Sequence, residues 1–317
     1  MGNADAAALP SVSVIVPVHN GEVTIGACVE SLLALDYPKD KLEIIVVDNR
    51  STDGTGEILR RYPISTLSEG TVQSSYAARN RGILHSSGEC LAFTDADCVV
   101  DQEWLRPLMG ALSSPDVGGV AGLIEPHRVH SVIEEYQAEL ALRAERAFGG
   151  PVLPFAQTAN AAYKRLVFDR VGLFDAGIVF GGDLDFSWRM QREGQLRLAY
   201  EPRAVVRHRH RTTYRGLFRL YEKNAIANCL LGQRYPVDYY GTYAQVRTLL
   251  YLTREMLQNL VRAARAALRP QSRRSLSLPH AVRYAGEIWG WLRWRCGAVA
   301  LLASTTPEVA HLGEVHP

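Results

Sequence analysis

The sequence is poor in cysteine and has no long apolar run, and each absence excludes a class of protein. The five cysteines among its 317 residues form no C-x-x-C pair and no metal-type spacing, which argues against a disulfide framework or a structural zinc site. No stretch reaches the roughly 18 to 20 apolar residues that a membrane-spanning helix needs. The first dozen residues contain no Lys or Arg, so no secretory leader is indicated and we expect a reduced, cytosolic setting.

What is present is the composition of an ordinary globular protein, with 47% hydrophobic and 21% charged residues. The net charge of +2 hides an uneven distribution, because residues 203–295 carry 18 Lys and Arg against 4 Asp and Glu, whereas residues 1–202 carry 17 against 27. A basic segment of this kind favours an anionic partner: a membrane surface, a nucleic acid or a phosphorylated substrate. Mutual neutralisation of the two parts across a packed interface is the alternative.

Short β-branched runs alternate with amphipathic helical patterns in the first half of the chain. The runs at 12–18, 42–47 and 90–94 predict buried strands, and the patterns at 22–35 and 74–85 predict helices. This alternation is typical of an α/β fold with a mostly parallel central sheet and helices on both faces. In such sheets ligands bind at the carboxyl ends of the strands.

Four carboxylates follow three of the predicted strands, at the edge where a ligand is expected. They are Glu22, Asp48, Asp95 and Asp97. Their mutual repulsion makes a cation the natural partner. Asp95 and Asp97 form a D-x-D pair directly after the strand at 90–94, which suits Mg²⁺ or Mn²⁺ together with phosphate oxygens. A solvated turn is the alternative for this pair, since Asp favours turns.

Two histidines alternate with arginines after residue 206. Residues 204–206 predict a strand, so His208 and His210 would lie on one face, where a neutral imidazole can add a nitrogen ligand to a carboxylate-bound metal. The intervening arginines would lie on the other face. A basic surface hairpin that binds anions is the alternative interpretation.

Another carboxylate follows two glycines at the expected start of a helix. Gly181 and Gly182 permit unusual backbone angles or the close approach of a ligand, and Asp183 then opens the helix. A carboxylate held at a helix start beside a cleft can act as a general base, and it can equally serve as an N-cap. Asp185 lies four residues before Arg189, which is the spacing of a helical ion pair.

Six segments, in this order, resemble the motifs of the family 2 inverting glycosyltransferases, which have the GT-A fold. The resemblance runs from about Ser11 to His210. It implies a single nucleotide-diphospho-sugar-binding domain over residues 11–215, and six ordered motifs are far more specific than one D-x-D pair. The segments are Val14–Asn20, Val46–Gly54, Ala77–Gly82, Phe93–Asp97, Thr158–Tyr163 and Gly181–Arg189.

On the donor side the resemblance assigns five positions. It implies that Pro17 and Asn20 border the nucleotide, with Glu22 close behind them. Asp48 matches the carboxylate that contacts the base, usually uracil, and Arg79 matches the arginine near the diphosphate. The donor implied in this way is a nucleotide-diphospho-sugar, with UDP as the expected nucleotide.

The resemblance also assigns metal-binding and catalytic roles, to the D-x-D pair and to residues of two later segments. Asp95 resembles the ribose-side residue and Asp97 the metal-side residue, so a Mg²⁺ or Mn²⁺ cofactor is implied, with Asp95 a further candidate ligand. His208 resembles the histidine that joins the metal shell, and His210 is a close alternative. Asp183 matches the aspartate that takes the acceptor proton, in a single displacement that inverts the anomeric configuration.

The sequence also departs from the family's pattern. Gly182 stands where Glu is usual, which bears on acceptor choice and on the assignment of Asp183. His19 stands where Tyr or Phe is common, and Asn49-Arg50 where Asp-Gly is common. The segment 125–157 and the C-terminal helices are expected to choose the acceptor. The acceptor-side candidates from the last two motifs are Asn160, Asp185 and Trp188.

Beyond residue 215 the pattern changes to three amphipathic helices, predicted at 217–231, 244–268 and 281–303. Aromatic residues beside arginines on a non-spanning helix suit a membrane interface. We therefore expect residues 216–304 to form a basic extension that contacts an anionic membrane surface. A helical cap on the sheet domain, or a homodimer contact, is the alternative. The tryptophans of the third helix are Trp289, Trp291 and Trp294.

These features predict a metal-dependent inverting glycosyltransferase on the cytoplasmic face of the membrane, with a lipid-linked or membrane-proximal acceptor and a role in cell-envelope glycan or glycolipid synthesis. A sugar nucleotidyltransferase would carry a Gly-rich, Arg-containing phosphate loop after the first strand, and Pro17–Glu22 is not such a loop. A non-catalytic scaffold of the same fold would not need Arg79 or Asp183. No reading-helix motif supports nucleic-acid binding, so no nucleic-acid partner is expected.

Overall fold

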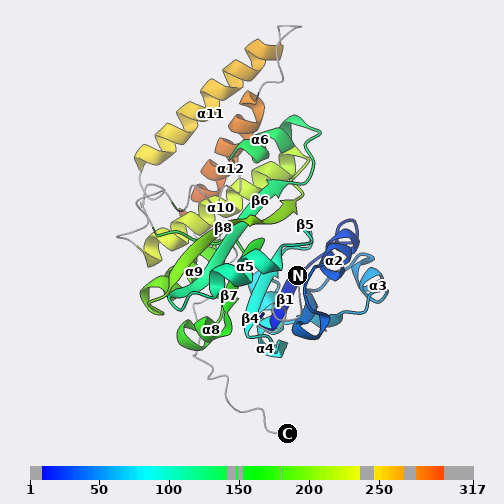
Figure 1. Ribbon diagram of the computed structural model, residues 1–317. Coiled ribbons are helices and arrows are strands. Elements are labelled where there is room, and N and C mark those ends of the chain that lie inside the picture. The colour runs from blue at the N-terminus through cyan, green and yellow to red at the C-terminus, as the bar shows by residue number, and fades with distance from the viewer. Residues whose placement is uncertain are drawn as a thin grey trace.

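An eight-stranded sheet forms the centre of the molecule, and three long helices lie to one side of it (Figure 1). The computed structural model describes residues 9–140, 148, 153–178, 180–235, 246–267 and 276–295. The strands are β1 (Val12–Val18), β2 (Leu42–Asp48), β3 (Ser65–Ser68), β4 (Cys90–Thr94), β5 (Cys98–Val100), β6 (Val117–Pro126), β7 (Asn160–Lys164) and β8 (Arg197–His208).

The strand order is β3-β2-β1-β4-β7-β6-β8-β5. Neighbours are parallel in the pairs β1–β2, β1–β4, β2–β3 and β6–β8, and antiparallel in β4–β7, β6–β7 and β5–β8. Most pairings among the described residues are therefore parallel, which confirms the predicted sheet. The antiparallel strand β7 enters between β4 and β6, and this insertion has no local signature in the sequence.

Helices cover both faces of the sheet, as predicted, and every residue of β1 is buried. Val14 and Val16 belong to a core shared with α2 (Ile25–Leu33) and α5 (Leu105–Leu112). Ile15 belongs to a second core, on the opposite face. Alternate residues of a strand point to opposite faces, so a sheet covered on both sides requires strands that are apolar throughout. The helices of the second core are α4 (Ser75–His85), α8 (Arg165–Val171) and α9 (Gly182–Arg192).

Shorter helical segments and three long helices complete the described structure. The shorter ones are η1 (Lys39–Lys41), α3 (Thr55–Leu59) and α6 (Val132–Leu140). The long ones are α10 (Tyr214–Arg234), α11 (Val246–Ala267) and α12 (Ser277–Arg295), which match most of the predicted C-terminal helices. The predicted ends at 244–245, 268 and 296–303 lie outside the described residues. Within the described ranges, no helix combines the length and the apolar character needed to cross a bilayer.

The long helices are built onto the sheet part through α10. Leu231 of α10 and the following Tyr235 pack with Leu184 and Trp188 of α9. Helix α12 packs against both α10 and α11, and α11 is the outermost helix of the three (Figure 1). The predicted boundary between 11–215 and 216–304 stays a prediction, and the contacts of α10 give the two parts a shared core.

The exposure of α12 corrects one expectation about its aromatic residues. Trp291 is only 8% exposed, because α12 lies tightly against α10. A Cβ atom on the neighbouring Gly290 would come within 2.4 Å of the Glu222 carbonyl oxygen. Trp291 is therefore a packing residue and offers no surface to a membrane, whereas Trp289 is 50% exposed.

Candidate active site

The carboxyl ends of β1, β2 and β4 lie together, as the sequence predicts. Val18, the last residue of β1, pairs with Asp48, the last residue of β2, and β4 runs parallel to β1 on its other side. Pro17 is buried in β1 opposite Val47. The loops that follow the three strands therefore border one edge of the sheet, which is where a parallel sheet binds its ligands.

Backbone geometry and side-chain bonds hold the first two loops together. Asn20 and Arg50 have positive φ angles of 52° and 64°. The Asn20 side-chain oxygen accepts the Thr52 N–H at 2.8 Å, and the Asn20 N–H donates to the Ser51 hydroxyl at 2.9 Å. Asn is one of the few residues with a side chain that adopts this backbone conformation readily. The loop expected to border the nucleotide is thus fixed by its neighbour.

Two of the four carboxylates at this edge of the sheet accept hydrogen bonds from the backbone of the second loop. A Glu22 carboxylate oxygen accepts the Gly54 N–H at 2.9 Å, and a carboxylate oxygen of Asp48 accepts the Ser51 N–H at 2.9 Å. Such bonds stabilise turns and the starts of helices. Glu22 and Asp48 therefore do not converge with the D-x-D pair on one cation, which corrects the simple expectation of four carboxylates around a metal.

Asp95 lies beside the buried arginine of α4. A terminal nitrogen of Arg79 donates a short hydrogen bond to the Asp95 carboxylate, and the Arg79 side chain is only 3% exposed. The Nε atom of Arg79 has no hydrogen-bond partner among the described residues. Arg79 therefore places a fixed positive charge beside Asp95 at this edge of the sheet.

Asp97 and His208 meet where the D-x-D loop approaches the end of β8. The Nε2 atom of His208 lies 3.5 Å from a carboxylate oxygen of Asp97. The potential ligand atoms of Asp97, Cys98 and His208 all lie within 4.8 Å of one another. Burial raises the pKa of Asp97, and a neighbouring positive charge would offset that cost.

This cluster fits a hard divalent cation through two of its three members. Cys98 offers a soft sulfur ligand, which Mg²⁺ and Mn²⁺ disfavour, and its burial also raises the pKa of the thiol. The carboxylate of Asp97 and the imidazole of His208 remain, and this donor set suits Mg²⁺ or Mn²⁺ when substrate oxygens complete the shell. Asp95, bound to Arg79, lies outside the cluster.

His210 is close to His208 without joining the cluster. The centroids of the two rings are 5.4 Å apart. Burial, followed by the charge of His208, lowers the pKa of His210 to about 4, so its ring is neutral near pH 7. The structure favours His208 over His210 as the nitrogen ligand, since the ligand atoms of His210 are not among those that meet Asp97.

Asp183 is the second residue of α9, which begins at Gly182 after the N-cap Gly181 with its left-handed φ of 83°. One carboxylate oxygen accepts the Leu184 N–H at 3.0 Å and the Tyr76 hydroxyl at 3.4 Å. Burial raises the pKa of this carboxyl, while Arg79 and nearby backbone amides lower it. A partly exposed carboxylate with a raised pKa is the type of group that accepts protons in enzymes.

The acceptor-side candidates are placed differently from the expectation. Asn160 is 1% exposed; its amide donates to the carbonyl oxygens of Leu123 and Ala204, both at 2.8 Å. Its side-chain oxygen accepts the indole N–H of Trp104 at 2.8 Å. Asn160 therefore joins β7 to β6, β8 and α5 inside the core. It has no polar atom left for an acceptor.

Asp185 and Trp188 are also interior residues. Asp185 is fully buried and pairs with Arg189 at 2.9 Å, as the helical spacing predicts. It also accepts the Tyr235 hydroxyl at 2.6 Å and lies 3.2 Å from Arg234. Trp188 is 1% exposed. Both residues join α9 to the end of α10, so their role is structural. This corrects the expectation that they face the acceptor.

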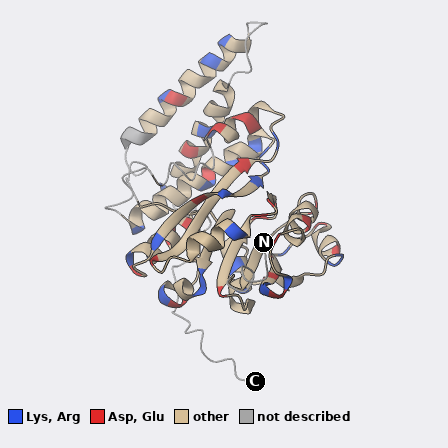
Figure 2. Ribbon diagram, in the orientation of Figure 1, with Lys and Arg blue, Asp and Glu red and all other residues tan. Residues whose placement is uncertain are grey.

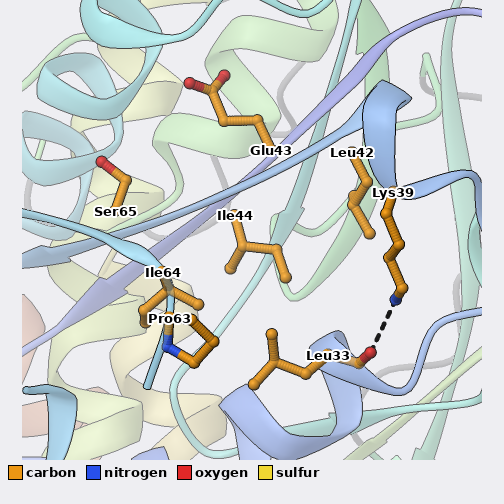
Figure 3. A pocket seen from close by; sticks show the side chains of 8 residues that line it. All are labelled: Leu33, Lys39, Leu42, Glu43, Ile44, Pro63, Ile64 and Ser65. Carbon is orange, nitrogen blue, oxygen red and sulfur yellow. Dashed lines mark hydrogen bonds between the residues drawn. The ribbon is translucent and has the colours of Figure 1, made fainter. Parts of the chain in front are cut away.

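The two described cavities lie at the other end of the parallel strands. One, of about 320 Å³, opens beside the starts of β2 and β3, where the Lys39 ammonium donates to the Leu33 carbonyl oxygen at 2.8 Å (Figure 3). The other, of about 680 Å³, lies near Cys90 at the start of β4. Neither includes Asp97, Asp183 or their neighbours.

The decisive comparison is with a protein family. Residues 13–172 match the profile of Glycosyl transferase family 2, which is half of the chain. The chain belongs to this family. The matched region contains β1, the D-x-D pair and Arg79, and Asp183 lies just beyond it.

Individual relatives of this family 2 member support the assignment. Glycosyltransferase AglE of Haloferax volcanii is 36% identical over 193 residues, covering 59% of this chain and 63% of that protein. The poly(ribitol-phosphate) beta-glucosyltransferase of Bacillus spizizenii is 37% identical over 216 residues, covering 60% of this chain and 34% of that protein. The chain thus spans less than two thirds of the length of these relatives.

A solved structure shows the same fold. The mannosyltransferase PcManGT from Pyrobaculum calidifontis, in complex with GDP-Man and Mn²⁺, superposes with a TM-score of 0.64 at 22% identity. The match covers 90% of this chain and 87% of that one. The likeness confirms the GT-A fold with its helical extension.

Sequence reasoning missed the residues that hold the site in place. Tyr76, which contacts Asp183, lies in α4 more than a hundred positions earlier. Arg234 and Tyr235 reach Asp185 from the end of α10. These contacts join distant segments, so no local spacing indicates them. One signal in the sequence lay next to these contacts: Gly182 stands where the family that the chain resembles usually has Glu.

Proposed function

We propose that this family 2 glycosyltransferase transfers a sugar from a nucleotide-diphospho-sugar to an acceptor hydroxyl with inversion at the anomeric carbon. The observation that carries the proposal is the link between a candidate base and a donor-side arginine through one side chain. Asp183 lies 3.4 Å from the Tyr76 hydroxyl, and the Arg79 guanidinium lies 5.4 Å from the centroid of the Tyr76 ring. A proton acceptor and a binding group for the leaving phosphate are thus neighbours, as direct displacement requires.

In the proposed step the acceptor oxygen bonds to the anomeric carbon as the bond to the diphosphate breaks. The hydroxyl proton passes to the carboxylate of Asp183, and the electron pair of the broken bond stays with the nucleoside diphosphate. Arg79 is proposed to stabilise the charge that develops on that group, because its guanidinium holds a fixed positive charge next to Asp95.

Asp97 and His208 are the residues proposed to hold Mg²⁺ or Mn²⁺. When bound, such an ion supplies positive charge to the oxygens of the diphosphate. This proposal is supported by the potential ligand atoms at this position, since the Asp97 carboxylate oxygen and the His208 Nε2 atom lie 3.5 Å apart. The Mn²⁺ in the complex of PcManGT is consistent with this choice.

A UDP-sugar is the proposed donor, because the family resemblance assigns Asp48 to the base. PcManGT was solved with GDP-Man, so the guanine nucleotide is the alternative to test first. A donor screen separates them: nucleotide release from UDP-, GDP- and dTDP-sugars is measured with Mg²⁺ or Mn²⁺. Turnover restricted to GDP-sugars would contradict the uridine assignment and leave the transferase intact.

The general base is tested by Asp183→Asn. We expect this variant to keep its affinity for the nucleotide-sugar and to lose about 10²-fold or more in transfer, the usual scale for a general base. Asp40→Asn, in the short helix η1 at the opposite end of β2, is the matched control and should behave as wild type. Transfer that survives in Asp183→Asn would contradict the assignment.

For the acceptor we propose a lipid-linked or membrane-proximal glycan of the cell envelope, reached by peripheral binding of α11 to an anionic cytoplasmic leaflet. One face of α11 packs inward through Leu252 and Asn259, which are 4% and 5% exposed. The opposite face exposes Leu250, Leu257 and Val261 at 66%, 54% and 50%. These three lie at spacings of seven and four residues, which places them on one stripe of the helix.

Charge on the same helix complements an anionic surface. The exposed Arg254, Arg262 and Arg265 lie near the apolar stripe, and basic bands recur along α11 in Figure 2. The only acidic residue between Val246 and Ala267 is Glu255. Each arginine close to the membrane adds roughly 1 kcal/mol, and apolar insertion adds to it.

Sedimentation with vesicles tests this surface. We expect binding to phosphatidylglycerol vesicles at low salt, weaker binding at high salt, and about tenfold or greater loss in Leu257→Glu combined with Val261→Glu. Leu84→Glu, on the 48%-exposed Leu84 of α4, is the matched control and should bind as wild type. No binding at low salt would contradict the membrane contact, and a dimer that the same substitutions dissociate would assign the face to a second copy.

A further inference from the structure

The start of α9 is held between two other helices. A Cβ atom on Gly182 would lie 2.8 Å from the ring of Tyr76, and one on Gly181 would lie 2.9 Å from Leu231. Contacts below 3.0 Å are shorter than packed atoms tolerate, so a side chain at position 182 requires the tyrosine ring to move. Tyr76 from α4 therefore occupies the space into which the family's usual Glu would begin.

The hydroxyl of Tyr76 is directed at the backbone and side chain of Asp183. It donates to a carboxylate oxygen of Asp183 and accepts the Asp183 N–H, both at 3.4 Å. Tyr76 is 5% exposed, and its ring packs on Phe174 with centroids 5.7 Å apart. Because the ring is fixed by this packing, the hydroxyl has a defined position relative to the carboxylate.

Tyr76 also contacts the donor side. The guanidinium of Arg79 lies 5.4 Å from the centroid of its ring, within the range of a cation–π interaction, and Arg79 binds Asp95. One buried side chain thus touches the candidate base and the candidate phosphate-binding arginine.

We propose that Tyr76 is a positioning residue that orients the carboxylate of Asp183 toward the acceptor hydroxyl, and that Gly182 is the residue that makes room for it. The inference rests on the proposed function of Asp183 as the base. In this chain the Tyr76 ring lies where a side chain at position 182 would begin.

The hydroxyl affects both the direction and the proton affinity of the carboxylate. A hydroxyl that donates to a carboxylate favours its ionised form, so removing the hydroxyl raises the pKa of Asp183. Burial raises the pKa of Tyr76 itself, which keeps the hydroxyl protonated and able to donate. The other titratable groups that face Asp183 are Arg79 from α4, which lowers its pKa, and Tyr163 from β7.

Tyr76→Phe tests the inference because it keeps the ring and removes only the hydroxyl. We expect about a tenfold fall in kcat, a donor KM unchanged within about twofold, and an acid limb of the pH–rate profile moved to higher pH. Tyr37→Phe is the matched control: Tyr37 is equally buried and donates to the Pro10 carbonyl oxygen at 2.6 Å, far from the site. It should lower stability and leave the pH profile in place.

The outcomes separate this inference from the proposed function. If Asp183→Asn is inactive while Tyr76→Phe matches wild type in kcat and pH profile, the role of Tyr76 is refuted and the base stands. If Asp183→Asn transfers normally, the proposed function itself fails. A rise in donor KM alone would place Tyr76 with Arg79 and also refute a role in orienting the base.

A second measurement does not depend on knowing the acceptor. The Asp183 carboxyl can be titrated by ¹³C NMR, with Asp183→Asn used to identify its signal. We expect the pKa of this carboxyl to rise in Tyr76→Phe and to stay unchanged in Tyr37→Phe. An Asp183 pKa that does not move in Tyr76→Phe would overturn the inference even without a transfer assay.

Discussion

Replacement of Asn160 by alanine is the sharpest test of the core that supports the site. The substitution removes three hydrogen bonds at 2.8 Å and leaves their partners, the Trp104 indole and the carbonyl oxygens of Leu123 and Ala204, without a substitute. A buried polar group left unpaired costs about 1 to 3 kcal/mol. Three such groups, partly relieved by water or relaxation, give an expected loss of roughly 3 to 6 kcal/mol.

A loss of this size is a large share of the free energy of unfolding of a typical domain, which is about 5 to 15 kcal/mol. Urea denaturation followed by tryptophan fluorescence measures it, since the midpoint falls with stability. Asn259→Ala is the matched control: Asn259 is also buried, but among the residues that the structure describes its amide donates to one group, the Glu255 carbonyl oxygen within α11. We expect a change below about 1 kcal/mol there.

The same experiment decides between the two roles considered for Asn160. A structural residue lowers the denaturation midpoint and leaves the KM for acceptor unchanged in the protein that remains folded. An unchanged midpoint with a raised acceptor KM would refute the structural role and restore the acceptor-side assignment.

Four further predictions concern the site itself. Excess chelator should abolish turnover, and Asp97→Asn should lower it by about 10²-fold or more; full turnover under chelation would remove the metal from the mechanism. Because burial raises the pKa of Asp183, the rate should fall on acidification at a higher pH than an ordinary aspartate titrates, and the pH–rate profile measures this. The same raised pKa means that ionisation of Asp183 destabilises the folded state. The stability of the protonated form is present at low pH and is lost as pH rises through the folded-state pKa. Asp183→Asn should therefore be more resistant to urea than wild type at pH 7. Gly182→Ala should lower kcat, because the new Cβ would lie 2.8 Å from the Tyr76 ring and would force the ring to move. An unchanged kcat would show that the ring can move without affecting catalysis.

The meeting of the three carboxylate-bearing loops at one edge of the sheet was predictable, because these loops directly follow strands. The apolar runs of β1, β2 and β4 identify the strands, and parallel pairing brings their carboxyl ends together. Asp95 and Asp97 follow β4 directly, so their place at this edge follows from the local pattern. The local pattern does not show which residues contact these two carboxylates. Arg79 contacts Asp95 from the middle of α4, and His208 contacts Asp97 from the end of β8.

The roles of Asn160 and Asp185 could not be predicted from the sequence, because both residues are held by contacts between distant segments. A motif identifies Asn160 and Asp185 as unusual polar residues and does not reveal whether they face a ligand or the core. Their burial decides the question, and burial depends on Trp104 and on Arg234, which are far away in the sequence. The same limit applies to Trp291, whose amphipathic helix lies against α10.

The helical extension and the catalytic chemistry are therefore connected through α9. Its first turn carries Asp183 between Tyr76 of α4 and Leu231 of α10, and its next turn carries Asp185, bound by Arg234 at the end of α10. A displacement of α10 must move the segment that presents Asp183, because packed interiors transmit shifts instead of absorbing them. Since α12 packs on α10 and α11 packs on α12, a surface bound through α11 is joined to the base by continuous helix packing. Under the proposed function, this packing would let the extension influence how the acceptor approaches Asp183.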